Sequence, residues 1–255
     1  MKKGESEMTI NEYLYYPMGK GFSAMGIAEA RDKMIEKFTL DEDGIKVNLY
    51  KTNSTLVFHA EIPSHSTKGL YYDTIVEFPY GKADMNKGNN IFEFPFKVYS
   101  NCPSFVYSYA YIFYQKHLIC DWLVSRYDKK TLTTPPTKRN SWGIIFYEQS
   151  IFFTLYYIKK YFGMSVMELD SLAVKSSHST IKDNVSSETN IRSTRTEIKN
   201  AIRKTKDGHS VSNKRAIVDY DKGSTANGVK KASSLKTAKS AKGTSKPKGL
   251  KGTKK

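Results

Sequence analysis

Cysteine and long apolar segments are both scarce in this chain of 255 residues. The two cysteines, Cys102 and Cys120, are too few for a disulfide framework or a cysteine-based metal site. The most apolar stretch, residues 143–158, is shorter than the roughly 18 to 20 residues that a membrane span needs, and Glu148 and Gln149 interrupt it. This stretch therefore predicts a buried helix, and we expect no contact with a membrane.

The first residues lack the apolar core of a secretory signal, because in MKKGESEMTI two lysines are followed by polar residues. The small number of cysteines also favours a reducing compartment. We therefore expect the protein to remain in the cytoplasm of the cell that makes it.

Acidic and aromatic residues are scarce in the last third of the chain. Residues 1–170 contain 20 Lys and Arg against 19 Asp and Glu, a net charge of +1, whereas residues 171–255 contain 21 against 6, a net charge of +15. Of the 33 aromatic residues, 32 precede Gly163 and Tyr220 follows it. Because so little apolar area remains to offset the entropy of ordering, we expect residues 171–255 to form a disordered basic tail.

Alternating apolar residues after Asp41 predict an antiparallel sheet. Residues 45–49 and 56–62 each place apolar side chains on one face and are separated by a turn, which indicates a hairpin. Residues 74–78 and 92–98 continue the alternation, and Pro95 suggests an edge strand because it cannot donate to a ladder. The next strand is predicted within residues 98–114.

Helical patterns lie on both sides of this strand-rich part. Residues 1–40 predict an arm and a short helix, whereas residues 117–127 and 142–162 predict two helices, the second capped by Ser141. The predicted fold class is therefore α+β, with a mostly antiparallel β-sheet domain at 41–170 closed by two C-terminal helices.

The tail contains one segment with helical character. Thr194 and Glu197 have capping-box spacing and Gly208 can end a helix, so a short basic helix is predicted at 194–207. Residues 222–255 hold 11 lysines and neither an acid nor an aromatic residue. The cations expected to contact nucleic acid are Arg192, Arg195, Lys199, Arg203, Lys204, Lys230, Lys231, Lys236, Lys239, Lys242, Lys246, Lys248, Lys251, Lys254 and Lys255.

An uncharged aromatic run, VYSNCPSFVYSYAYIFY at 98–114, allows two interpretations. A stacking platform for bases is normally flanked by Lys or Arg, and this run contains neither. It also lacks the basic residue and the glycine of an RNA-recognition motif. The run therefore predicts a strand that is apolar on both faces, inside a core or a subunit interface. Its core or interface residues are Phe105, Tyr107, Tyr109, Tyr111 and Phe113.

Motifs for catalysis and ligand binding are weak. MGKGFSAMG lacks the Gly-Lys-Ser/Thr of a phosphate loop, and the five histidines show no metal-ligand spacing. His117 and Cys120 are the one candidate nucleophile pair, although a buried cysteine beside a helix-start histidine explains them as well. We predict no enzyme activity, no cofactor and no metal site.

Three segments together suggest a family. IPSHSTKGLYYDTIVEF (62–78), the aromatic run and PPTKRNSWGIIFYEQSIFFTLYYIKKY resemble small virion structural proteins of tailed phages that infect low-GC hosts. The chain is also rich in Lys, Asn, Tyr and Ile, as such an origin implies. The resemblance covers roughly residues 62–162 and implies an assembly component that contacts other virion proteins or itself. It extends neither to the tail nor to individual functional residues.

Two functions follow from these features. The first is a virion structural or assembly protein, made in the host cytoplasm, whose tail contacts packaged DNA or an acidic partner. The alternative is a cytoplasmic nucleic-acid-binding protein, with a dimerising domain and a tail that binds phosphates without reading sequence.

Overall fold

Five β-strands form a single, mostly antiparallel sheet in this computed structural model. The structure describes residues 8–15, 23–81, 89–141, 143–187, 191, 193–197 and 200, all within the unit formed by residues 1–218. The strands are β1 (Lys46–Lys51), β2 (Thr55–Pro63), β3 (Tyr71–Pro79), β4 (Lys97–Ser100) and β5 (Val174–Lys175), in the order β4-β3-β2-β1-β5. The pair β1–β5 is parallel and the others are antiparallel. The predicted α+β class and antiparallel sheet are confirmed.

Short helices surround this sheet. The α-helices are α1 (Ile10–Tyr15), α2 (Ala24–Asp41), α4 (Pro103–Ser108), α5 (Ala110–Gln115), α6 (Lys129–Thr133), α7 (Gln149–Tyr161), α8 (Val166–Leu172) and α9 (His178–Asp183). Three 3-10 turns complete the described elements, η1 (Glu42–Gly44), η2 (Ile91–Glu93) and η3 (Asp121–Arg126). Where one short helix was predicted within residues 1–40, the described residues 8–15 and 23–41 hold two, and α2 has 18 residues.

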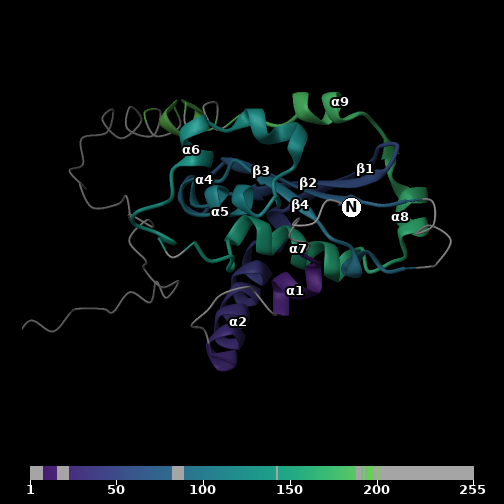
Figure 1. Ribbon diagram of the computed structural model, residues 1–255, viewed down its shortest axis with the longest axis horizontal. Helices are drawn as coiled ribbons and strands as arrows, with labels where there is room; N and C mark the ends of the chain where they lie inside the picture. The colour runs from purple at the N-terminus through teal and green to yellow at the C-terminus, as the bar shows by residue number, and fades with distance from the viewer. Residues whose placement is uncertain are drawn as a thin grey trace, which may run out of the picture. The chain divides into compact units, whose positions relative to one another are not determined.

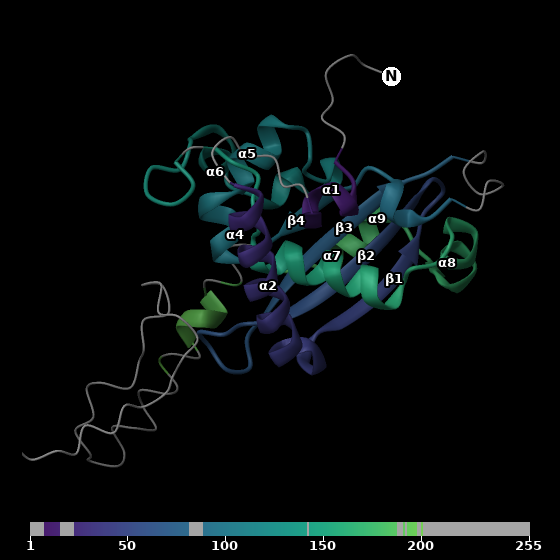
Figure 2. The same cartoon turned by 90° about the horizontal axis from the view of Figure 1, so that it is seen from below.

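The sheet is covered on both faces. Figures 1 and 2 show α7 on one face and α9 on the other, with the strands between them. Because side chains alternate along a strand, Phe58 on β2 and its partner Val76 on β3 point to the α7 face, whereas His59 and its partner Ile75 point to the α9 face. We call these two sides the α7 face and the α9 face.

Helix α7 begins later than the sequence suggests. The predicted helix at 142–162 was capped by Ser141, but α7 starts at Gln149 and Glu148 is its N-cap, accepting a hydrogen bond from the Ile151 N–H. The preceding chain turns at Asn140 and Gly143, which have φ of 53° and 63° and do not continue a right-handed helix. The side chains of its first two turns are buried, so α7 is the central helix of its face.

The predicted helix at 117–127 is also wrong. His117 has φ of 58°, which reverses the chain, and Val98 exchanges backbone hydrogen bonds with Leu118 and Cys120 at 2.7 and 2.9 Å. Residues 118–120 therefore extend the sheet beside β4, and only the 3-10 turn η3 and the short α6 follow. Closure of the sheet by the two predicted helices is not observed.

The globular part extends beyond residue 170, where the sequence analysis placed its end. Val174 pairs with Tyr50 of β1, and the side chains of Ile181 and Val185 are 1% and 2% exposed. The strand edge of β1 and the Ser177 cap of α9 supply hydrogen bonds that composition does not reveal. Residues 171–187 are thus part of the fold, and the expectation of disorder for residues 201–255 lies outside the described residues.

Candidate nucleic-acid interface

The aromatic run is helical after β4, so the predicted doubly buried strand is wrong. Hydrogen bonds from the Tyr109 N–H to the Phe105 carbonyl (2.8 Å) and from the Phe113 N–H to the Tyr109 carbonyl (3.0 Å) carry the helical pattern through the junction of α4 and α5. Burial follows a period of 3.6 residues: the side chains of Phe105, Val106, Ala110 and Phe113 are at most 3% exposed. Alternate aromatic residues from 105 to 113 had suggested a period of two.

The outer side of α4 and α5 carries a tyrosine stripe, which we define as Tyr107, Tyr111 and Tyr114. Tyr111 and Tyr114 are three residues apart and share a face of α5, and Tyr107 lies four residues before Tyr111, on α4. Tyr107 is 54% exposed, Tyr114 is 38% exposed and Tyr111 is half-buried. Of the five predicted core or interface residues, Phe105 and Phe113 thus lie in the core, whereas Tyr107 and Tyr111 belong to the stripe.

Tyr109, the fifth of these residues, lies between the core and the surface. Burial raises the pKa of its hydroxyl to about 12, and the nearby Glu148 carboxylate acts in the same direction, whereas Arg139 opposes them. The hydroxyl is therefore protonated at neutral pH. The electrostatic interaction of the Tyr109 hydroxyl with Arg139 shows that the Arg139 side chain lies close to the junction of α4 and α5.

Five exposed cations belong to segments that follow the tyrosine stripe in the chain and lie next to α4 or α5. Lys116 follows directly after α5, Lys129 and Lys130 begin α6, which packs against α5, and Lys138 and Arg139 belong to the loop after α6. We call these five residues the cation ring.

Asn140 fixes the loop that carries two of these cations. Its amide group donates hydrogen bonds to the carbonyls of Ser108 and Ile144, both at 2.9 Å, and its side-chain oxygen accepts one from the Ile144 N–H. The bond to Ser108, the last residue of α4, holds the loop with Lys138 and Arg139 against the junction of α4 and α5. Lys116 follows directly after α5.

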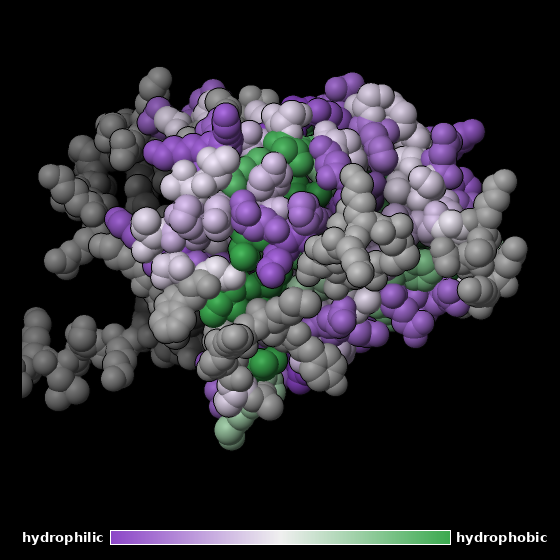
Figure 3. All heavy atoms as spheres, viewed as in Figure 1, coloured by the Kyte–Doolittle hydropathy of each residue, from purple (hydrophilic) through white to green (hydrophobic). Residues whose placement is uncertain are grey.

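Charge in the folded part is polarised toward this surface. Residues 101–141 contain six Lys and Arg against two Asp and Glu, a net charge of +4, whereas the rest of residues 1–170 contains 14 against 17, a net charge of −3. One of the two acids, Asp121, is paired with Lys97 at 2.5 Å. In Figure 3, hydrophilic side chains predominate along the upper edge of the molecule, where Figure 1 shows α6 and α9.

Helix α9 and the described residues after it contact η3, the loop before β3 and the residue before α4. Arg126 of η3 donates to the Lys182 carbonyl at 2.6 Å, and Ile191 packs with Leu70 and Tyr72 next to Cys102, the residue before α4. Arg195 donates to the Ser66 hydroxyl at 3.1 Å. Residues 191, 193–197 and 200 are helical, within and just before the predicted basic helix. The other predicted tail cations, Arg192, Lys199, Arg203, Lys204 and the lysines from 230 to 255, lie outside the described residues.

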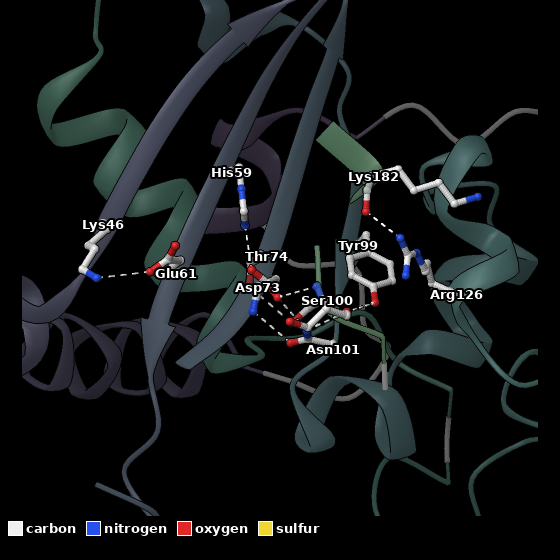
Figure 4. Close-up of polar contacts among 11 residues, drawn as sticks. Lys46, His59, Glu61, Asp73, Thr74, Tyr99, Ser100, Asn101, Arg126 and Lys182 are labelled. Carbon is white, nitrogen blue, oxygen red and sulfur yellow. Dashed lines mark hydrogen bonds and ion pairs between the residues drawn. The ribbon is translucent and has the colours of Figure 1, made fainter. Parts of the chain in front are cut away.

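A buried polar network lies under α9. The Asp73 carboxylate accepts hydrogen bonds from His59 Nε2 (2.7 Å), the Asn101 amide (3.0 Å) and the Ser186 N–H (2.9 Å). Figure 4 shows His59 and Asn101 directed at Asp73. The Tyr99 hydroxyl and Asn101 both donate to the Ser186 carbonyl, at 3.1 and 3.0 Å. These bonds join β2, β3 and the end of β4 to the segment after α9, so we assign the network to folding.

A second polar group lies at the start of α7. Glu148 is 1% exposed, and its Oε2 accepts from Ser150 (2.6 Å) and the Ile151 N–H (3.1 Å), whereas Oε1 has no hydrogen-bond partner among the described residues. Burial raises the pKa of this carboxyl. Burial also raises the pKa of the neighbouring Cys102 thiol, and Glu148 adds to that effect. The Cys102 thiol is therefore not suited to act as a nucleophile at neutral pH.

The candidate pair His117 and Cys120 is not brought together on a helix. His117 is an exposed residue with positive φ, whereas Cys120 is fully buried beside Val98. Burial raises the pKa of the Cys120 thiol, and Glu77 has the same effect. The Glu77 carboxylate is itself engaged by Trp122 Nε1 at 2.9 Å and by His178 at 3.3 Å.

A surface cleft of about 400 Å³ opens at one end of the sheet, and its lining includes Lys51, Tyr80, Asp170 and Lys175. Lys51 and the Tyr80 hydroxyl bind the Asp170 carboxylate at 2.8 and 2.6 Å. Although burial raises the pKa of Asp170, these two hydrogen bonds lower it overall. Lys51 and Asp170 thus form an ion pair in the cleft, and Lys175 is a second cation of its lining.

Comparisons with known proteins add no family to this description. No protein-family model matches the chain, and neither a curated protein nor a solved structure is significantly similar to it. Among the described residues, no cluster of His, Cys, Asp or Glu could hold a metal ion. In the same part of the chain, no helix has both the length and the apolar character to span a membrane.

Proposed function

We propose that this protein is a non-enzymatic virion structural or assembly protein of a tailed phage, whose basic C-terminal tail contacts packaged DNA. The observation that carries the proposal is the division of charge, with +15 in residues 171–255 against +1 in residues 1–170. Lysines spaced by small residues neutralise phosphates and release counterions without reading bases. The folded domain supplies contacts to other virion proteins or to a second copy.

The polar clusters of the domain support a structural role. The carboxylates of Asp73, Glu77 and Asp170 each accept hydrogen bonds from side chains on other elements, and these bonds join β2 to β3, η3 to β3 and β1 to α8. The buried thiols are held in their protonated form. Such groups position chain segments, which is what a subunit of an assembly requires.

A tail variant tests the assignment of DNA contact. The boundary matters, because removal of all residues after Leu172 also removes the buried Ile181 and Val185. We therefore choose the full-length chain with its 11 lysines from Lys222 to Lys255 changed to Gln. Its duplex affinity should fall, and the slope of log affinity against log salt should flatten by about 0.9 for each phosphate that the tail no longer neutralises. An unchanged slope would contradict the role of the tail.

Particle composition tests the assignment to a virion. Particles purified from a producing culture should contain this chain in a fixed copy number that survives high-salt washing. Its absence from such particles would refute the virion role and favour the alternative, a cytoplasmic nucleic-acid-binding protein. The polarised charge of the folded domain is the observation that favours that alternative.

A further inference from the structure

We infer that the folded domain has its own binding site for single-stranded nucleic acid, formed by the tyrosine stripe and the cation ring. This inference deepens the proposed function, which assigns nucleic-acid contact to the tail. The partner is defined by chemistry: unpaired bases that stack on tyrosine rings, joined by phosphates that bind Lys and Arg.

The rings have the geometry of a stacking surface. Tyr111 and Tyr114 share a face of α5, about 4.5 Å apart along its axis, and Tyr107 precedes them on α4, across the junction at Tyr109. Buried side chains of the same two helices, including Phe105 and Phe113, hold the stripe on a rigid base. A row of rings over this distance accommodates successive bases of one strand and accepts any base, because every base has a π-face.

The cations lie where a phosphate backbone would pass. Lys138 and Arg139 belong to the loop that the bond from Asn140 to the Ser108 carbonyl holds at the junction of α4 and α5, and Lys116 follows α5. Lys129 and Lys130 lie along the side, on α6. Lys116 follows the aromatic run in the sequence, and tertiary structure brings the segments with the other four cations next to it.

Charge favours a polyanion over an apolar protein partner. The surface belongs to a segment with a net charge of +4, in a domain whose other residues up to 170 sum to −3. One of its two acids is paired with Lys97, so the local field is more positive than the count suggests. Long-range attraction therefore directs a polyanion to this face.

Exposed rings favour a single strand over a duplex. The bases of a duplex are stacked on one another, so a ring can reach them only after they unstack. A single strand offers its bases and phosphates together, which matches a surface that presents rings and cations side by side. The described start of the tail passes next to Cys102, at the beginning of α4, so tail and domain can engage the same strand.

The test compares matched variants of the full chain by their affinity for a short oligothymidylate and for a duplex of the same length. The ring variant combines Tyr111→Leu and Tyr114→Leu, and its control is Tyr71→Leu, another exposed tyrosine. The charge variant combines Lys116→Gln, Lys138→Gln and Arg139→Gln. Its control changes the exposed Lys33, Lys46 and Lys68 to Gln.

The ring variant should bind oligothymidylate about 5-fold to 100-fold more weakly, with an unchanged salt slope and unchanged duplex affinity. The charge variant should flatten the salt slope for oligothymidylate by about 2, and both controls should behave as the parent protein. Circular dichroism and thermal melting identify variants that have lost their fold. If the ring variant is among them, the single substitutions Tyr114→Phe and Tyr114→Leu take its place. Equal losses for the duplex, or no loss for oligothymidylate, overturn the inference.

The tail variant separates this inference from the proposed function. If the tail variant loses all nucleic-acid binding and the ring variant loses none, the domain site is refuted while the proposed tail contact stands. If instead the tail variant keeps its affinity and the ring variant loses it, the tail assignment fails and the domain site stands. Weaker binding by both variants supports both the tail contact and the domain site.

Discussion

The two faces of the sheet are held by different kinds of contact. On the α7 face, Phe58 packs edge-to-face against Phe78 and Phe162, with ring centroids 5.8 and 5.2 Å apart. On the α9 face, the polar network around Asp73 fastens the segment after α9 to the sheet. One face depends on apolar area and shape, and the other depends on complete hydrogen bonding.

This difference explains why the two coverings differ in sequence. An apolar face can be recognised from a long amphipathic pattern, and α7 has such a pattern. A covering that relies on hydrogen bonds needs only a few apolar anchors, here Ile181 and Val185, and its sequence is polar. The α9 segment therefore has the composition of a tail while forming part of the fold.

The largest expected effect comes from breaking the α7 face. Phe58→Ala removes a fully buried ring, and we expect the free energy of unfolding to fall by about 3 to 5 kcal/mol. Denaturant titration followed by circular dichroism measures the change. Phe58→Leu is the control, and it should lower the free energy of unfolding by less than about half as much as Phe58→Ala does. A decrease below about 1 kcal/mol for the alanine variant would contradict the packing described for this face.

Breaking the α9 face should have a smaller effect. Asp73→Ala leaves donors on His59, Asn101 and Ser186 without their acceptor, which should cost about 2 to 3 kcal/mol. Hydrogen exchange should show the loss of protection concentrated at Ser186, with α7 amides little affected. Asp73→Asn, which keeps one acceptor oxygen, should retain part of the stability. Uniform loss of protection across α7 would show that the two faces are not separable.

The smallest effect concerns the buried carboxyl at the start of α7. Because burial raises the folded-state pKa of Glu148, the folded protein holds a proton that the unfolded chain releases above the ordinary value of 4.5. Stability from this group is therefore present at low pH and lost as pH rises through that window. Glu148→Gln should remove this pH dependence and change stability at neutral pH by about 1 kcal/mol.

Glu168 is the matched control for that pH dependence. Hydrogen bonds from Ser165 lower the pKa of its carboxylate in the capping box of α8, so its stabilising contribution is lost as pH falls. Melting temperatures of Glu148→Gln and Glu168→Gln across an acid-to-neutral series should therefore deviate from the parent protein in opposite directions. A deviation in the same direction would contradict the burial described for Glu148.

Local pattern was sufficient for part of the fold. The hairpin predicted at 45–49 and 56–62 is confirmed, because alternation and the turn at Asn53 and Ser54 are local properties. The start of α7 was not predictable, because it depends on turns at Asn140 and Gly143 that positive φ values define. The candidate surface was missed for a related reason: its cations come from segments that follow the tyrosines in the chain and fold back beside them.

The sequence by itself determined the division of charge and the antiparallel hairpin, because net charge depends on composition alone and strand patterning on neighbouring residues. Only the tertiary structure decided that the aromatic run is helical, because its spacing fits two periods and burial against the core selects one. Tertiary structure also placed Lys138 and Arg139 next to the tyrosine stripe, since the Asn140 hydrogen bonds hold their loop against the end of α4.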